Sequence, residues 1–156
     1  MHGTLEPYRE ERLVSINFIW DDNEHAWQEG FGHLEEYFSK NENCLVPDNY
    51  RPNGYNLAKW VEHQRRAKIV GSLVTEKIAK LDSINFIWSV PDYMWDSAFA
   101  LLEKYHIREK NCEVPSKHLE EGFGLGHWVR HQRKKKKKEM LSKERIEKLN
   151  GVNFVW

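Results

Sequence analysis

The chain contains one sequence unit that recurs every 68 residues, and this repeat limits the folds that it can adopt. The sequence SINFIW at residues 15–20 returns at residues 83–88, and it returns in altered form as GVNFVW at residues 151–156. Residues 21–88 align with residues 89–156 without a gap, and 25 of the 68 aligned pairs are identical. A fixed period of this length indicates a folding unit in tandem copies.

The repeat divides the chain into three segments. We expect residues 21–88 and 89–156 to be two whole repeats, and residues 1–20 to be the C-terminal remnant of an upstream repeat. A unit of this size is only marginally stable alone, because small chains bury a low fraction of their surface. The aromatic content of 13% compensates, since each buried ring removes a large apolar area from water.

The apolar spacing within each repeat predicts three helices and no strand. Trp27, Phe31 and Leu34 fall on one face of a first helix, and the second copy keeps this register. Leu57 begins the apolar face of a second helix, and Leu81 lies on a shorter third helix. The predicted fold class is therefore all-α, with two tandem three-helix domains preceded by the tail of a third repeat.

Residues that tolerate unusual backbone geometry recur between the helices. Gly54 and Gly122 are expected to make a turn that other residues cannot make. Asn17, Asn85 and Asn153 precede the closing Phe-x-Trp, and asparagine adopts left-handed backbone more readily than most residues. Each repeat should therefore end in a turn and a short extended segment that places its Phe and Trp in the core.

Several classes of protein are disfavoured by composition. Two cysteines, Cys44 and Cys112, lie at equivalent repeat positions, which is too few for a small disulfide scaffold and favours one small buried hydrophobe per repeat. The alternative, a disulfide between the two, would need a special packing of the repeats. This pattern favours a reducing, cytoplasmic location. No apolar run approaches the length that crosses a bilayer, and no secretory signal is recognisable. We expect no membrane partner.

The formal charge is zero overall, but it differs between the repeats. Residues 21–88 carry 8 basic and 11 acidic groups, a net charge of −3, whereas residues 89–156 carry 14 and 10, a net charge of +4. The second repeat is therefore the better candidate for binding an anionic partner.

A long mixed motif recurs in both copies. It reads Trp…Phe…Leu…Tyr, Val-Pro, Gly-x-x-Leu-x-x-Trp-Val-x-x-Gln-Arg, and Leu…Ile-x-x-Leu…Phe-x-Trp. This motif resembles the helicase-associated domain, a family of tandem repeats found with superfamily 2 helicase cores. The resemblance implies a small three-helix domain, a helicase core as partner in the parent protein, and a role in nucleic-acid binding. Family members commonly have Gly after the second-helix Leu, where Gly126 agrees and Ala58 departs.

The strongest candidate for function is the second helix, which reads WVEHQRR in one copy and WVRHQRK in the other. A helix with one apolar face and one basic face is typical of an element that contacts phosphates or bases. A run of five lysines follows in the second copy and would bind a polyanion with strong salt dependence. The predicted nucleic-acid-binding residues are His63, Arg65, Arg66, Lys68, Arg130, His131, Arg133, Lys134, Lys135, Lys136, Lys137 and Lys138.

Structural interpretations of the same residues remain open. Gln64 and Gln132 also fit a core-facing register in which they bond a loop backbone, and Arg65 and Arg133 could pair with acids of the first helix. The lysine run could simply be solvated.

The aromatic residues have two interpretations as well. The tryptophans fit a helical core better than a set of stacking platforms for bases. Tyr37, Tyr50 and Tyr55 are expected to be half exposed and are the better candidates for stacking.

The resemblance, together with the basic second helix, implies a non-catalytic accessory module of a larger helicase-like protein that binds nucleic acid, DNA or RNA, through the basic face of the second helix. The alternative is a protein-interaction module that docks on the helicase core or on a partner protein. The carboxylates form no duplicated acid–base pair, there is no Gly-Lys-Ser/Thr phosphate loop, and there is no Cys-x-x-Cys motif. We therefore expect no enzyme activity, cofactor, metal or small-molecule substrate.

Overall fold

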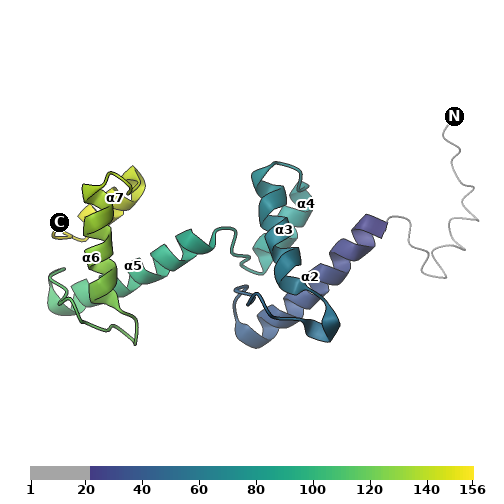
Figure 1. The fold of residues 1–156 in the computed structure, drawn as a ribbon, viewed down its shortest axis with the longest axis horizontal. Helices are drawn as coiled ribbons and strands as arrows, with labels where there is room; N and C mark the ends of the chain where they lie inside the picture. The colour runs from purple at the N-terminus through teal and green to yellow at the C-terminus, as the bar shows by residue number, and fades with distance from the viewer. Residues whose placement is uncertain (1–21) are drawn as a thin grey trace, which may run out of the picture. The chain divides into compact units, whose positions relative to one another are not determined.

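The computed structural model describes residues 22–156, and every regular element in that range is helical. The first compact unit contains α2 (Asp22–Asn41), the 3-10 turn η1 (Pro52–Gly54), α3 (Leu57–Ile69) and α4 (Thr75–Ser83). The second contains α5 (Val90–Glu109), α6 (Leu125–Lys137) and α7 (Lys143–Gly151) (Figure 1). The all-α prediction of three helices in each of two repeats is confirmed.

The boundary between the two units lies between Trp88 and Ser89. We retain residues 21–88 and 89–156 as the proposed limits of the two repeats. The proposed remnant of an upstream repeat at residues 1–20, including Asn17, lies outside the described residues.

The core of each unit is built from aligned residues of its three helices. In each unit the long first helix packs against the second helix, which crosses it (Figure 1). Each helix contributes one fully buried leucine to its core, and the aligned pairs are Leu34 and Leu102, Leu57 and Leu125, and Leu81 and Leu149. Cys44 and Cys112 are both buried free thiols, as the composition predicted.

The turns use the residues that the sequence predicted. Gly54 and Gly122 have φ values of 82° and 81°, and Asn85 and Asn153 have φ values of 53° and 54°. All four lie in the left-handed region, which glycine and asparagine tolerate best. The predicted left-handed turn before each closing segment is therefore confirmed for the described repeats.

The closing segments only partly follow the prediction. Phe86 and Phe154 are buried, whereas Trp88 is half-buried and Trp156 is 36% exposed. The Trp88 indole donates to Asp82 Oδ1 at 2.6 Å, and the Trp156 indole makes the corresponding bond to Asn150 at 2.8 Å. The expectation that both closing aromatics enter the core holds for the phenylalanines and in part for Trp88, which packs half-buried against the core of its unit. It was wrong for Trp156, which lies at the surface with its N–H bonded to the third helix.

Candidate nucleic-acid interface

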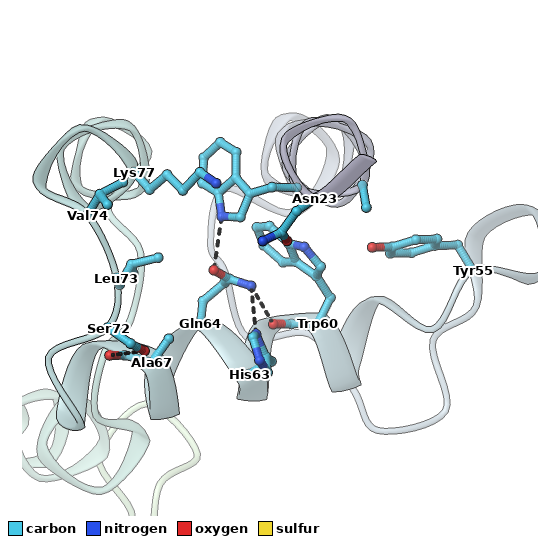
Figure 2. Close-up of a pocket in the computed structure, with 12 residues that line it drawn as sticks. Asn23, Tyr55, Trp60, His63, Gln64, Ala67, Ser72, Leu73, Val74 and Lys77 are labelled. Atoms are coloured by element: carbon cyan, nitrogen blue, oxygen red, sulfur yellow. Dashed lines mark hydrogen bonds between the residues drawn. The ribbon is translucent and has the colours of Figure 1, made fainter. Parts of the chain in front are cut away.

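The second helix of each repeat has one side committed to the core. Gln64 is buried and accepts a hydrogen bond from the Trp27 indole at 2.9 Å, and Gln132 accepts one from Trp95 at 3.0 Å. Figure 2 shows Gln64 at the centre of this arrangement. The core-facing interpretation of both glutamines is confirmed, but their partner is an indole of the first helix and not a loop backbone. A buried amide bonded in this way holds the helices in register.

Two arginines of the predicted site are bound to the closing segments. Arg65 Nε donates to the Ile87 carbonyl at 2.8 Å, and Arg133 Nε donates to the Val155 carbonyl at 2.7 Å. The Arg65 guanidinium also lies 5.5 Å from the ring centre of Phe86, and burial lowers its pKa. The expected pairing with acids of the first helix was wrong, since the fold brings a backbone carbonyl to the donor.

Two lysines of the predicted site cover the closing tryptophans. Lys68 Nζ lies 3.8 Å from the ring centre of Trp88, and Lys136 Nζ lies 3.7 Å from that of Trp156. A cation on an aromatic face at an exposed position is worth about 0.5–1 kcal/mol. We call this set of interactions the closing contact, and its residues are Arg65, Lys68, Arg133 and Lys136 with the Phe-x-Trp segments that they bind.

The remaining predicted residues do not take part in the closing contact. In the first repeat His63 and Arg66 are exposed, and in the second Lys135 is half-buried. The exposed set in the second repeat lies along one side of α6 and on its C-cap residue, Lys138. We call this set the basic face: Arg130, His131, Lys134, Lys137 and Lys138. Within residues 22–156, the structure pairs none of these five with a carboxylate.

A surface pocket of about 710 Å³ lies at the first half of the basic face. Its lining residues are Phe123, Gly124, His127, Trp128, Arg130, His131 and Lys134. The ring of Phe123 is 39% exposed, and Arg130 donates to His127 Nδ1 at 3.0 Å. Sequence reasoning missed Phe123 and His127, although His127 lies four residues before His131 and therefore on the same side of the helix.

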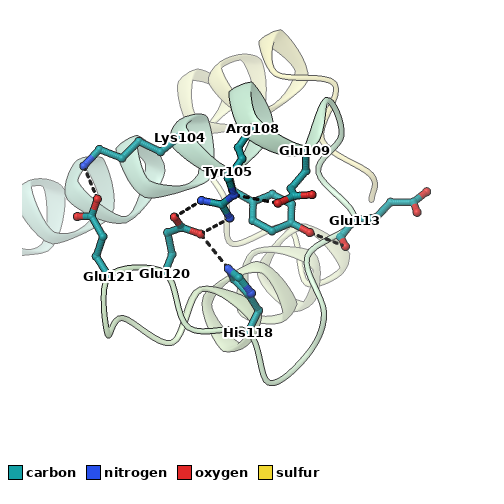
Figure 3. Close-up of polar contacts among 8 residues, drawn as sticks. All are labelled: Lys104, Tyr105, Arg108, Glu109, Glu113, His118, Glu120 and Glu121. Atoms are coloured by element: carbon teal, nitrogen blue, oxygen red, sulfur yellow. Dashed lines mark hydrogen bonds and ion pairs between the residues drawn. The ribbon is translucent and has the colours of Figure 1, made fainter.

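The loop before α6 is held by a partly buried ion network (Figure 3). The Glu120 carboxylate accepts two hydrogen bonds from Arg108, at 2.7 and 2.9 Å, and lies 2.8 Å from His118 Nε2. Hydrogen bonds from Arg108, then from His118, lower the pKa of Glu120 to about 2, and the same pairing raises the pKa of Arg108. Because the carboxylate is fixed by three hydrogen bonds, the loop has a defined position.

The backbone of Glu120 is hydrogen-bonded to the backbone of Phe123. Its N–H donates to the Phe123 carbonyl at 2.9 Å, and the Phe123 N–H donates to the Glu120 carbonyl at 2.8 Å. The aligned residue in the first repeat is Pro52, which has no N–H and makes only the second of these bonds, from Tyr55. The Phe123 backbone therefore has an additional hydrogen bond that the first repeat cannot form.

The first repeat has a smaller pocket, of about 440 Å³, between α2, α3 and α4 (Figure 2). Its wall includes Trp60 and His63, and also Leu73, Val74 and Lys77 from the segment that leads into α4 and from α4 itself. Lys77 is bound to Glu24 at 2.7 Å, so this pocket offers less positive charge than the pocket beside the basic face.

The tyrosine prediction holds for two residues of three. Tyr50 and Tyr55 are half-buried, but Tyr37 is buried and its hydroxyl donates to the Leu45 carbonyl at 2.8 Å. Burial raises the pKa of Tyr37. Tyr55 lies 4.7 Å from the His33 ring, between ring centres, and Tyr50 packs edge-on against Tyr37. Tyr37 is therefore excluded as a stacking platform for bases.

Metal binding and thiol chemistry have little support among the described residues. No group of three or more His, Cys, Asp or Glu side chains in residues 22–156 is arranged to hold a metal ion. Burial raises the pKa of the Cys44 thiol to about 11, so it is a poor nucleophile. None of the described helices has the length and apolarity required to cross a lipid bilayer.

The repeat matches a known family twice. The sequence profile of the helicase associated domain family matches residues 24–89 and again residues 92–156, which together cover most of the chain. Comparisons with curated proteins and with solved structures gave no match.

Proposed function

Because the chain belongs to the helicase associated domain family, we propose that it is a non-catalytic accessory module that binds nucleic acid, DNA or RNA, beside the helicase core of its parent protein. Binding occurs mainly through the basic face of α6 in the second repeat. The observation that supports this most directly is the lack of acidic partners for that face among the described residues, although the unit holds ten acidic groups.

Charge geometry favours a polyanion over a small anion. Arg130 and Lys134 are one helical turn apart, with about 5–6 Å between Cβ atoms, and Lys137 and Lys138 extend the row by another turn. A row of separate cations matches a row of phosphates, and each phosphate neutralised releases counterions. The first repeat, with Glu62, Ile69 and Val70 at three of the aligned positions, has no equivalent row.

We also divide the predicted residues by role. We assign the basic face to phosphate contact and the closing contact to stability, because Arg133 and Lys136 are already bound to Val155 and Trp156. A test of binding should therefore leave Arg133 and Lys136 unchanged, since altering them would affect folding as well as charge.

The test is a fluorescence anisotropy titration of labelled single-stranded and duplex DNA and RNA. The test variant changes Arg130, Lys134 and Lys137 to Gln, and the matched control changes three exposed lysines elsewhere in the second repeat, namely Lys110, Lys117 and Lys143. We expect the test variant to lower the slope of log affinity against log salt by about 0.7–0.9 for each phosphate that the protein no longer neutralises.

The two variants carry the same change in net charge, so their comparison separates a local site from general attraction. Equal weakening by both variants would contradict a site on the basic face. If the folded parent protein does not bind any of the nucleic acids at low salt, the proposed function is wrong.

A second candidate function has a specific observation in its favour. Ile69, Val70 and Val74 are exposed around the turn between α3 and α4, where the second repeat has Lys137, Lys138 and Ser142. Exposed apolar residues that lie close in sequence are typical of a protein-docking surface. This arrangement favours docking of the first repeat on the helicase core or on a partner protein.

Docking is tested by giving the first repeat the residues of the second, with Ile69→Lys and Val70→Lys. If docking is correct, the double variant loses binding to the helicase core of the parent protein and keeps its affinity for nucleic acid. Unchanged binding to the core would exclude this surface.

A further inference from the structure

We propose that the pocket beside the basic face binds one unpaired nucleobase of a single strand, which stacks on Phe123 while Arg130 and Lys134 contact the flanking phosphates. This inference rests on the proposed nucleic-acid binding and specifies its ligand. It assigns the base-stacking role to Phe123, which lies outside the lysine run.

The aromatic ring of Phe123 is accessible to a ligand. Phe123 is 39% exposed, and no other aromatic ring among the described residues stacks on it. The aligned Tyr55 is half-buried and lies against His33. An exposed phenyl ring beside a pocket offers the kind of surface on which bases of any sequence stack.

The loop that carries Phe123 is held in place by hydrogen bonds. Glu120 forms paired backbone hydrogen bonds with Phe123, and its carboxylate is held by Arg108 and His118 (Figure 3). A ring carried on an ordered backbone loses less conformational entropy than one on a mobile loop when a ligand stacks on it. The ion network therefore pre-organises the platform, and Glu120 acts as a positioning residue.

The wall of the pocket carries positive charge beside Phe123. Arg130, His131 and Lys134 line the same pocket as Phe123, so the site combines an apolar face with cations. A nucleotide presents a flat base next to a phosphate and matches both parts. In a duplex, base faces are hidden by their neighbours, so stacking of this kind requires a base that is unpaired or flipped out.

The first repeat provides an internal control for this inference. Glu62 occupies the position of Arg130, and a carboxylate there repels a phosphate. The first-repeat pocket that contains Tyr55, the residue aligned with Phe123, is lined by Leu73 and Val74 and not by a row of cations (Figure 2). Of the two repeats that the structure describes, only the second therefore has the proposed base site.

The experiment compares short single strands with abasic strands that have the same phosphates and lack the bases. Anisotropy titrations are made in DNA and RNA arms, with duplexes alongside. Stacking of one base on an aromatic ring predicts that the base-containing strand binds about ten-fold more tightly than the abasic strand. Base dependence in either arm supports the proposal, and the arm with the tighter binding identifies the strand.

Variants locate the base-dependent part of the affinity. Phe123→Leu should remove the ten-fold difference and leave binding to the abasic strand unchanged, which also shows that the variant is folded. Phe123→Tyr should retain the difference, and Tyr55→Leu is the matched control in the first repeat, where no change is expected.

The outcomes separate this inference from the proposed function. If abasic and base-containing strands bind equally and in a salt-dependent manner, the stacking site is wrong and the phosphate interface stands. If the ten-fold difference survives Phe123→Leu, the base lies elsewhere and the inference is overturned. If no strand binds the folded protein at low salt, the proposed function fails and the stacking site fails with it.

Discussion

The two repeats agree closely in their cores and differ in the loop that leads into the second helix. The indole-to-glutamine bond measures 2.9 Å in one repeat and 3.0 Å in the other, and the arginine-to-carbonyl bond measures 2.8 and 2.7 Å. In the loop, by contrast, the ion network of Arg108, His118 and Glu120 replaces Lys40, Tyr50 and Pro52 of the first repeat.

A polar residue that recurs in both repeats can serve packing and not binding. Gln64 and Arg65, with their copies, belong to the motif that most resembled a binding surface, and both pairs are hydrogen-bonded within their own repeat. The residues with free charge are mostly those that differ between repeats, such as Arg130 against Glu62. Identity between tandem copies indicates shared packing, whereas divergence indicates where the copies specialise.

The largest expected effect comes from exchanging the residue that follows the first leucine of the second helix. A Cβ on Gly126 would lie 2.1 Å from the Pro115 carbonyl oxygen, whereas the first repeat has Ala58 at this position. Gly126→Ala should destabilise the second repeat by about 1–3 kcal/mol through overpacking. Urea unfolding combined with hydrogen exchange of the α6 amides measures this loss.

The reverse exchange is the control. Ala58→Gly removes a methyl group and adds backbone freedom, so it should cost the first repeat only about 0.5–1 kcal/mol. Equal losses of stability from the two substitutions would show that the preceding loop lies equally close to the second helix in both repeats. That result would contradict the clash expected at Gly126.

Acid should destabilise the second repeat through a group that the first repeat lacks. The pKa of Glu120 is lowered in the folded state to about 2 from an ordinary value of 4.5, so the unfolded chain takes up the proton first as the pH falls. The stabilisation from Glu120 is therefore complete above pH 4.5 and is lost progressively towards pH 2.

Hydrogen exchange between pH 5 and pH 2, read separately for the two repeats, measures this difference. Glu120→Gln should remove this component of the pH dependence from the second repeat and leave the first repeat unaffected. A steep acid loss that persists in Glu120→Gln would assign the effect to other carboxylates.

The closing contact should contribute equally to the two repeats. Arg65→Met and Arg133→Met each keep the aliphatic stem and remove one hydrogen bond and one cation on a ring, at a cost of about 1 kcal/mol. Exchange of the Phe86 and Phe154 amides, which lie in the closing segments, measures the loss. If Arg133→Met weakens binding of nucleic acid and leaves stability unchanged, this arginine belongs to the interface.

The smallest expected effect concerns the N-cap of the second helix. Asn56 caps α3 by accepting from the Lys59 N–H at 3.2 Å, whereas Gly124 has no side chain to cap α6. Gly124 has a φ of −70°, and a Cβ there meets only His127 Cβ, at 3.9 Å. Gly124→Asn should therefore stabilise the second repeat by about 0.3 kcal/mol. Thermal unfolding detects this shift, and a decrease in stability would show that the cap geometry differs between the repeats.

Local patterns were sufficient to predict the elements of the fold. Apolar spacing located all three helices of each repeat, and the chemistry of asparagine identified Asn85 and Asn153 as left-handed residues. These features depend on neighbours within a few positions in sequence, which is the range over which helical periodicity and turn propensity act.

Partners brought together by the tertiary fold were not predictable in the same way. The acceptor of Arg65 is the carbonyl of Ile87, 22 positions away, and every residue has such a carbonyl. Arg108 and Glu120 meet only because the loop folds back against the end of α5. The location of the pocket at Phe123 depends on that loop, so composition and spacing drew attention to the lysine run instead.

The closing contact also bears on how such arrays change during evolution. In the first repeat, Phe86 and Trp88 complete a core made from residues of that unit, and the next position, Ser89, caps the first helix of the following unit. A duplication or deletion that begins and ends at this junction adds or removes one whole domain and requires no new core packing. Copy number can therefore change in a single genetic event, after which each new domain is free to acquire its own surface.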